Sequence, residues 1–174
     1  MTRNMKRGFT LVEILIVVII LGILAAIVIP QFTNASQDAR KSSLVSQLQT
    51  LRSQVELFKL QHRDTYPTSD GSATGTWDWT MLTTKTDANR VASTAANAFG
   101  PYLQATPVNP INDGTVGAAS STMLSVATDP LPGAAVTGPG GWIFSQATGK
   151  IYATSKLGGR VYDEGNPSAA TNDQ

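Results

Sequence analysis

An unbroken apolar run near the N-terminus constrains this chain more than any other feature. It extends over residues 9–29 and is followed by Pro30. Apart from Thr10 and Glu13, none of its residues is polar. As an α-helix, its 21 residues span about 31 Å at ~1.5 Å per residue, which matches the ~30 Å hydrocarbon core of a bilayer. The run therefore predicts a helix that crosses a membrane.

The residues around the run predict its orientation. Arg3, Lys6 and Arg7 all precede it, and positive charge on this side predicts a cytoplasmic N-terminus. An ordinary secretory signal fits poorly, because its apolar core has about 7–15 residues and would not contain Glu13. A plain single-pass anchor fits the length of the run but leaves Glu13 without a role.

The stretch after Pro30 also has the pattern of a helix. Neither glycine nor proline occurs between Gln31 and Asp64. Five large apolar residues recur there at steps of four and three, which places them on one helix face. They are Leu44, Leu48, Leu51, Val55 and Phe58. We predict one helix from Phe9 to His62, kinked or loosened near Pro30, because proline lacks the N–H that the helix needs.

The remaining residues predict a small domain with long loops. The 174-residue chain leaves room for one modest core, and without cysteine that core has no disulfide. Two aromatic and β-branched runs, 141–145 and 150–154, flank a four-residue turn and predict a hairpin. Residues 122–127 are a further candidate strand, and residues 77–85 a short helix. The expected fold class is α+β, with the long helix packed on a small antiparallel β-sheet.

These patterns divide the chain into five segments. They are a leader of residues 1–8, the transmembrane half of the helix at 9–30, its amphipathic half at 31–62, an α+β domain at 63–165 and a flexible tail at 166–174. His62 is expected at the helix end, where a protonated imidazole suits the helix dipole. Trp77, Trp79 and Trp142 are expected in the core.

The composition excludes several kinds of chemistry. One histidine and no cysteine cannot form a zinc site or a Cys/His pair, and no GxSxG motif occurs. Composition alone leaves a Ser/His/Asp triad around His62 open. A net charge of +1 does not favour nucleic acid as a partner.

Glu13 requires a partner if the run lies in a membrane. A carboxylate at that depth costs about 2.5–3.5 kcal/mol on insertion scales. A cut between Gly8 and Phe9 would create an α-amino group four residues before Glu13. The amine of the same chain, or that of a neighbouring copy, could then pair with Glu13 and set the axial register of stacked helices.

The stretch Lys6–Phe32 resembles the class III signal and transmembrane half-helix of type IV pilins and type II secretion pseudopilins. The resemblance implies that a prepilin peptidase cuts after Gly8 and that the new N-terminal residue, Phe9, is N-methylated. It implies a role for Glu13 in filament assembly. It also implies that the helix loosens near Pro30 in the filament.

A weaker resemblance extends beyond this stretch. Residues 57–60 and the following 66–68 are similar to the end of the long helix in the major, G-type pseudopilin. That group has an Asp-rich calcium loop near its C-terminus, whereas Asp163, Glu164 and Asp173 are scattered here. We therefore expect no cofactor; calcium stays open, without a clear ligand loop. The lack of a cysteine pair departs from many adhesive type IV pilins.

The resemblance implies a structural role in type II protein secretion, and we therefore expect no enzyme activity. The subunit would sit in the inner membrane with its C-terminal domain in the periplasm, and then enter a periplasmic or surface filament. Its partners would be further copies of itself, minor pseudopilins, the prepilin peptidase, the inner-membrane assembly platform and membrane lipid. One alternative is a type IV pilus subunit for adhesion, motility or DNA uptake. Another is a membrane-anchored binding or hydrolytic domain that never polymerises.

The predicted processing has a direct test. Mass spectrometry of the chain purified from its membrane should show an N-terminus at Phe9 with one added methyl group. An N-terminus at Met1 would contradict the cleavage and would support the plain anchor.

Overall fold

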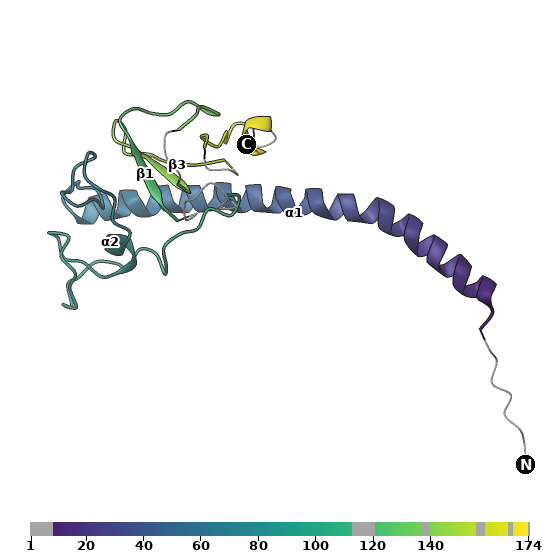
Figure 1. Cartoon of the computed structure of the whole chain (residues 1–174). Coiled ribbons are helices and arrows are strands. Elements are labelled where there is room, and N and C mark those ends of the chain that lie inside the picture. The colour runs from purple at the N-terminus through teal and green to yellow at the C-terminus, as the bar shows by residue number, and fades with distance from the viewer. Residues whose placement is uncertain (1–8, 113–120, 137–139, 156–158, 167–168, 174) are drawn as a thin grey trace, which may run out of the picture. The chain divides into compact units, whose positions relative to one another are not determined.

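The structure is a computed structural model that describes residues 9–112, 121–136, 140–155, 159–166 and 169–173. The chain divides into two units, Met1–Ala39 and Arg40–Gln174. Helix α1 contributes to both units, and all other elements belong to the second (Figure 1). The elements are α1 (Leu11–Gln61), α2 (Thr80–Thr83), β1 (Met123–Val126), β2 (Trp142–Ser145), β3 (Ile151–Ala153) and the 3-10 helix η1 (Ala170–Asp173).

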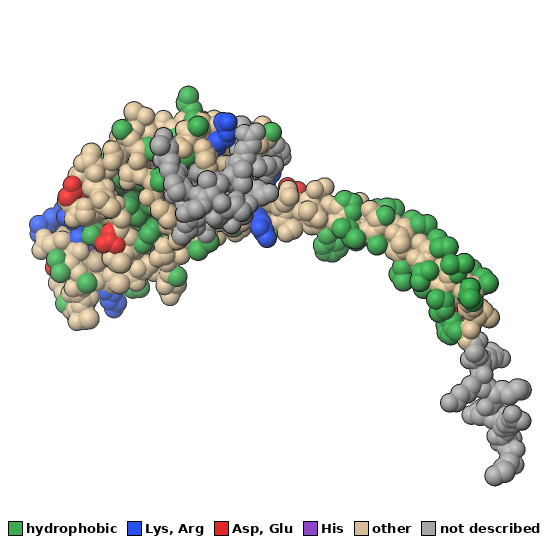
Figure 2. All heavy atoms as spheres, in the orientation of Figure 1, with side chains coloured by type: hydrophobic (Ala, Val, Ile, Leu, Met, Phe, Trp, Pro, Cys, Tyr) green, Lys and Arg blue, Asp and Glu red, His purple; other side chains and the backbone are tan. Residues whose placement is uncertain are grey.

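In the first unit, α1 has no protein cover. Every large hydrophobic side chain that the structure describes there is exposed, from Phe9 to Phe32. Figure 2 shows these side chains as an almost continuous apolar coat on the helix. The helix is long and apolar enough to cross a membrane, in agreement with the sequence pattern.

In the second unit, α1 supplies one wall of the hydrophobic core. The five apolar residues predicted to share a face are all buried in that core. Figure 1 shows the strands beside this part of α1, and Trp142, Phe144 and Ile151 of β2 and β3 join the same core cluster. The predicted helix of residues 9–62 is therefore confirmed, with observed bounds Leu11–Gln61.

The sheet has three strands in the order β1-β2-β3. The predicted hairpin is confirmed, since β2 and β3 pair antiparallel with Trp142 opposite Ala153. The prediction of a wholly antiparallel sheet is wrong, because β1 pairs parallel to β2 with Met123 opposite Trp142. Parallel neighbours need a long connection, and the residues between β1 and β2 are numerous enough to return the chain to the same end of the sheet.

His62 directly follows the last residue of α1, as predicted, and is a core residue. It is completely buried and stacks on Phe58 with ring centroids 3.9 Å apart. Its two ring nitrogens lie 2.9 Å from the Phe58 carbonyl and 2.9 Å from the Thr86 hydroxyl. Tyr102 packs edge-on against Phe58, and burial raises the pKa of its phenol to about 12. The ring stack closes the core where α1 ends.

The tryptophans predicted to pack inside do so. Trp142 and Trp77 belong to the core, and Trp79 is partly buried against it. The Trp79 indole N–H donates to the Ser121 carbonyl, and that of Trp142 donates to the Pro107 carbonyl.

The C-terminal residues lie against the hairpin. Val161 bridges to Thr154, and the Tyr162 N–H donates to the Ala153 carbonyl at 2.9 Å. The predicted flexible tail from Asn166 requires a correction where the structure describes it, because Asn172 in η1 is buried. Its side-chain oxygen accepts a hydrogen bond from the Asp163 N–H at 2.7 Å.

The core predicts the effect of shortening Phe58. Phe58→Ala should lower the free energy of unfolding by about 3–5 kcal/mol, because it opens a cavity between His62 and Tyr102. Leu60→Ala is the matched control on the same helix. Leu60 is 82 % exposed, so its loss should cost about 0.5 kcal/mol or less. Both free energies of unfolding can be measured by urea titration of the full chain in detergent micelles, with tryptophan fluorescence as the signal. An equal loss of stability in Phe58→Ala and Leu60→Ala would contradict the burial of Phe58 in this core.

Candidate functional site

The candidate site is the first turn of α1, where Thr10 and Glu13 bind each other. The Thr10 backbone N–H and its hydroxyl both lie 3.4 Å from Glu13 Oε2. In return, the Glu13 N–H donates to the Thr10 hydroxyl oxygen at 3.2 Å. This reciprocal pattern is a capping box, in which the residue before the helix and the third helical residue satisfy each other's N–H groups.

The capping box gives the Glu13 carboxylate a partner within its own helix. The free N–H groups of a helix N-terminus also carry a partial positive charge, which favours an acidic side chain in the first turn. The side chains of Thr10 and Glu13 are both exposed, so a second molecule can still reach the Glu13 carboxylate. The first turn can therefore hold a negative charge in an isolated helix and present it to a cation.

The other predicted site residues surround this turn. Phe9 directly precedes Thr10 and is 74 % exposed. Gly8, the predicted last residue of the leader, lies outside the described residues, as do Lys6 and Arg7. Pro30 lies inside α1, where its missing N–H leaves one helix carbonyl without its usual donor. Loosening of the helix at Pro30 stays a prediction.

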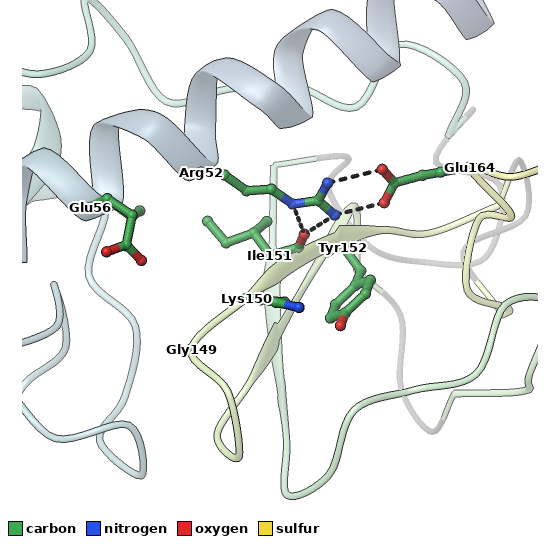
Figure 3. A pocket seen from close by; sticks show the side chains of 8 residues that line it. Arg52, Glu56, Gly149, Lys150, Ile151, Tyr152 and Glu164 are labelled. Atoms are coloured by element: carbon green, nitrogen blue, oxygen red, sulfur yellow. Dashed lines mark hydrogen bonds and ion pairs between the residues drawn. The ribbon is translucent and has the colours of Figure 1, made fainter.

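A second polar site joins α1 to β3 and the C-terminal segment. Arg52 on α1 makes two hydrogen bonds with the Glu164 carboxylate, Nη1 to Oε2 at 2.9 Å and Nη2 to Oε1 at 2.6 Å. Its Nε and Nη2 also donate to the Ile151 carbonyl, at 2.8 and 2.6 Å (Figure 3). The guanidinium carbon lies 5.6 Å from the ring centre of Tyr152. A bidentate pair of this kind is among the stronger side-chain interactions.

The Arg52 pair borders an open pocket of about 450 Å³. Glu56 from α1 and Lys150 and Tyr152 from the hairpin also line it (Figure 3). Because the guanidinium already binds Glu164 and the Ile151 carbonyl, it is not available for an anionic ligand. We assign Arg52 and Glu164 a structural role, in which they tie three segments distant in sequence to one another.

Two of the carboxylates considered for calcium bind protein donors, and the side chain of Asp173 lies outside the part that the structure describes. Glu164 binds Arg52, and Asp163 Oδ1 accepts hydrogen bonds from the Gly165 and Asn166 N–H groups at 3.0 and 3.1 Å. Within the described residues, no three His, Asp or Glu side chains form a group that could hold a metal ion.

The sequence contained a signal for Thr10 but none for Arg52. Thr-x-x-Glu at the start of an apolar helical run is the pattern of a capping box, and it identifies Thr10 as the partner of Glu13. Arg52 and Glu164 are 112 residues apart. No local pattern relates two residues at that separation.

Comparison with known proteins identifies the N-terminal segment. A family model described as the prokaryotic N-terminal methylation motif matches residues 3–29. Residues 3–29 thus carry this motif. The match contains the capping box, Phe9 and the proposed cleavage site at Gly8.

Curated relatives extend the resemblance beyond the motif. The type II secretion system core protein G of Dickeya chrysanthemi is 42% identical over 65 residues, which are 37% of this chain and 42% of that protein. The protein of the same name from Klebsiella michiganensis is 39% identical over 70 residues, 40% of this chain and 49% of its own. That of Escherichia coli strain K12 is 37% identical over 65 residues, 37% of this chain and 44% of its own.

These matches confirm the resemblance to pseudopilins over the part of the chain that they cover. The chain spans less than half the length of each of these relatives. No solved structure matches the chain.

The Arg52 junction predicts a coupled loss of stability. Arg52→Met and Glu164→Gln should each lower the free energy of unfolding, and the double variant should reveal a coupling of about 0.5–3 kcal/mol. Glu56→Ala, in the same pocket, should cost about 0.5 kcal/mol or less, because its side chain is 67% exposed. Urea titration of the two single variants, the double variant and Glu56→Ala measures these free energies of unfolding. If the loss in the double variant equals the sum of the losses in Arg52→Met and Glu164→Gln, the interaction between Arg52 and Glu164 is contradicted.

Proposed function

We propose that this chain is a structural subunit of a pilin-like filament, and that it is the major pseudopilin of a type II protein secretion system. One observation carries the proposal: a carboxylate in the first turn of a long apolar helix that has no protein cover in its own chain. The uncovered apolar helix lets a subunit rest in a membrane, and the carboxylate gives it a charged partner for a further copy when subunits pack. The printed names of the relatives favour a secretion pseudopilin over a type IV pilus subunit.

The proposed pathway begins in the inner membrane. The basic leader stays on the cytoplasmic side, where prepilin peptidase cuts between Gly8 and Phe9, and Phe9 is then methylated. The second unit faces the periplasm. The chain has no catalysis of its own in this proposal; it is a substrate of the peptidase and a partner of the assembly platform and of minor pseudopilins.

Glu13 has two successive partners in this mechanism. Before assembly, the capping box satisfies the carboxylate within the helix. During assembly, the amine at Phe9 of a neighbouring copy approaches the carboxylate. The attraction between an amine and a carboxylate is stronger away from water than at the surface, so it favours the one axial register in which the two groups meet. Loosening at Pro30 would let the helices adjust as they pack.

Substitutions at Glu13 separate charge pairing from helix capping. Glu13→Ala should reduce filament yield by about tenfold or more, since ~1.4 kcal/mol already corresponds to tenfold, and should leave cleavage intact. Glu13→Gln keeps an oxygen that can accept the Thr10 hydrogen bonds but removes the charge, and should fail like Glu13→Ala.

The measurements are filament yield after shearing and cleavage by gel shift. Asp38→Ala removes an exposed carboxylate elsewhere on α1 and serves as the control, with wild-type yield expected. If Glu13→Gln assembles at wild-type yield, the ion pair with the Phe9 amine is overturned and the capping of the helix by residue 13 remains as its role. If Glu13→Ala also assembles at wild-type yield, neither the ion pair nor the capping is needed for assembly.

A further inference from the structure

A groove on the second unit runs beside α1. It has an open volume of about 390 Å³ and lies between residues 43–51 of α1 and the segment 103–108. Its apolar lining comes from Leu51, Leu103, Pro107 and Val108. Val108 is 54 % exposed, so a partner that filled the groove would cover apolar surface that now faces solvent.

Two of the three hydroxyl groups along the groove bond within α1. Ser46 donates to the Ser42 carbonyl at 3.1 Å, and Thr50 donates to the Ser46 carbonyl at 3.0 Å. Such bonds to the preceding turn satisfy the hydroxyl donors within the helix. An apolar side chain can therefore cover this wall without leaving either donor unpaired.

One acceptor in the groove lacks a donor. Gln47 lines the groove, and its Oε1 is buried and accepts no hydrogen bond from any residue that the structure describes. Buried polar atoms of folded proteins are nearly always paired. The groove thus suits a partner that combines a large apolar side chain with a nearby hydroxyl or N–H group.

The chain itself carries a segment of this chemistry just beyond its apolar run. Phe32 on α1 is 73 % exposed. Ala35 and Ser36 follow at steps of three and four, so they share its helix face. Ala35 permits close approach, and the Ser36 hydroxyl is a donor. Residues 31–37 include no charged side chain whose burial would oppose docking.

The other exposed apolar side chains on α1 beyond the run fit less well. Leu57 and Leu60 are exposed, but Glu56 and Lys59 lie directly beside them in sequence. Placing either leucine in a groove would bury charge, which is costly unless a matching charge lies opposite. The groove lining includes no charged residue.

We propose that the groove receives Phe32 of a second copy of this chain, with Ser36 of that copy beside Gln47. The proposal rests on the proposed filament function, since it continues the packing of one α1 on another from the apolar run into the second unit. The contact is heterologous, because groove and Phe32 are different surfaces, and such contacts generate helical filaments when they do not close into a ring.

The absence of cysteine from the chain allows a direct test. Two differently tagged full-length versions, Phe32→Cys and Val108→Cys, are made together in cells that assemble the filament. Sheared filaments are then oxidised. We expect a mixed dimer that carries both tags. Phe32→Cys paired with Leu131→Cys is the matched control and should give none, because Leu131 is 75 % exposed but does not line the groove.

The outcomes separate this contact from the filament function. Filaments that form without the mixed dimer overturn the groove contact and leave the proposed function standing. Cells that form no filament from the wild-type chain overturn the proposed function itself. If Phe32→Cys alone prevents assembly, Ser36→Cys on the same helix face takes its place, with the same dimer expected.

A second variant tests the groove by function. Val108→Asp should lower filament yield by about tenfold or more, because it buries an unpaired charge at the contact. Its melting temperature should equal that of the wild type, since Val108 is exposed. Val91→Asp is the control at another exposed valine and should assemble normally. Equal yields from the two variants would overturn the proposal.

Discussion

The uncovered apolar surface of residues 9–29 is the constraint on which the rest of the molecule depends. Apolar surface in water costs about 25 cal/mol per Å², and nearly all of this helix is exposed within its own chain. Lipid can cover it, and so can other copies in the proposed filament. The chain therefore needs a cover for this helix that its own residues do not supply, and the second unit must fold without using that half of α1.

Glu13 can be paired both in lipid and in the proposed filament. Its hydrogen bonds to Thr10 give the carboxylate a partner within its own helix while that helix lies in lipid. These hydrogen bonds are 3.4 Å long and the side chain is exposed. In the proposed assembly, the amine of a neighbouring copy can therefore still reach the carboxylate. The second unit contributes stability by a separate route, in which the ring stack on Phe58 and the Arg52–Glu164 pair hold its loops and strands to α1.

The sequence predicted those features whose signal lies among near neighbours. The apolar stripe from Leu44 to Phe58 and the hairpin around residues 146–149 have periods that reveal which face is buried. It did not predict the parallel pairing of β1, because strand direction depends on the path of a long connection and not on the strand's own residues. It also gave no signal that His62 is buried, because a position at the end of a helix says nothing of the loop around Thr86 that covers the ring.

By itself, the sequence determined a helix apolar and long enough to cross a membrane, the N-terminal methylation motif, the position of Glu13 and the side of α1 that enters the core. Each follows from residue spacing along a single helix. Tertiary structure alone decided the partner of Arg52, the mixed sheet, the burial of His62 and the groove beside Val108. Each of these joins segments far apart in the chain, and their contacts depend on how loops return to α1, which no local period encodes.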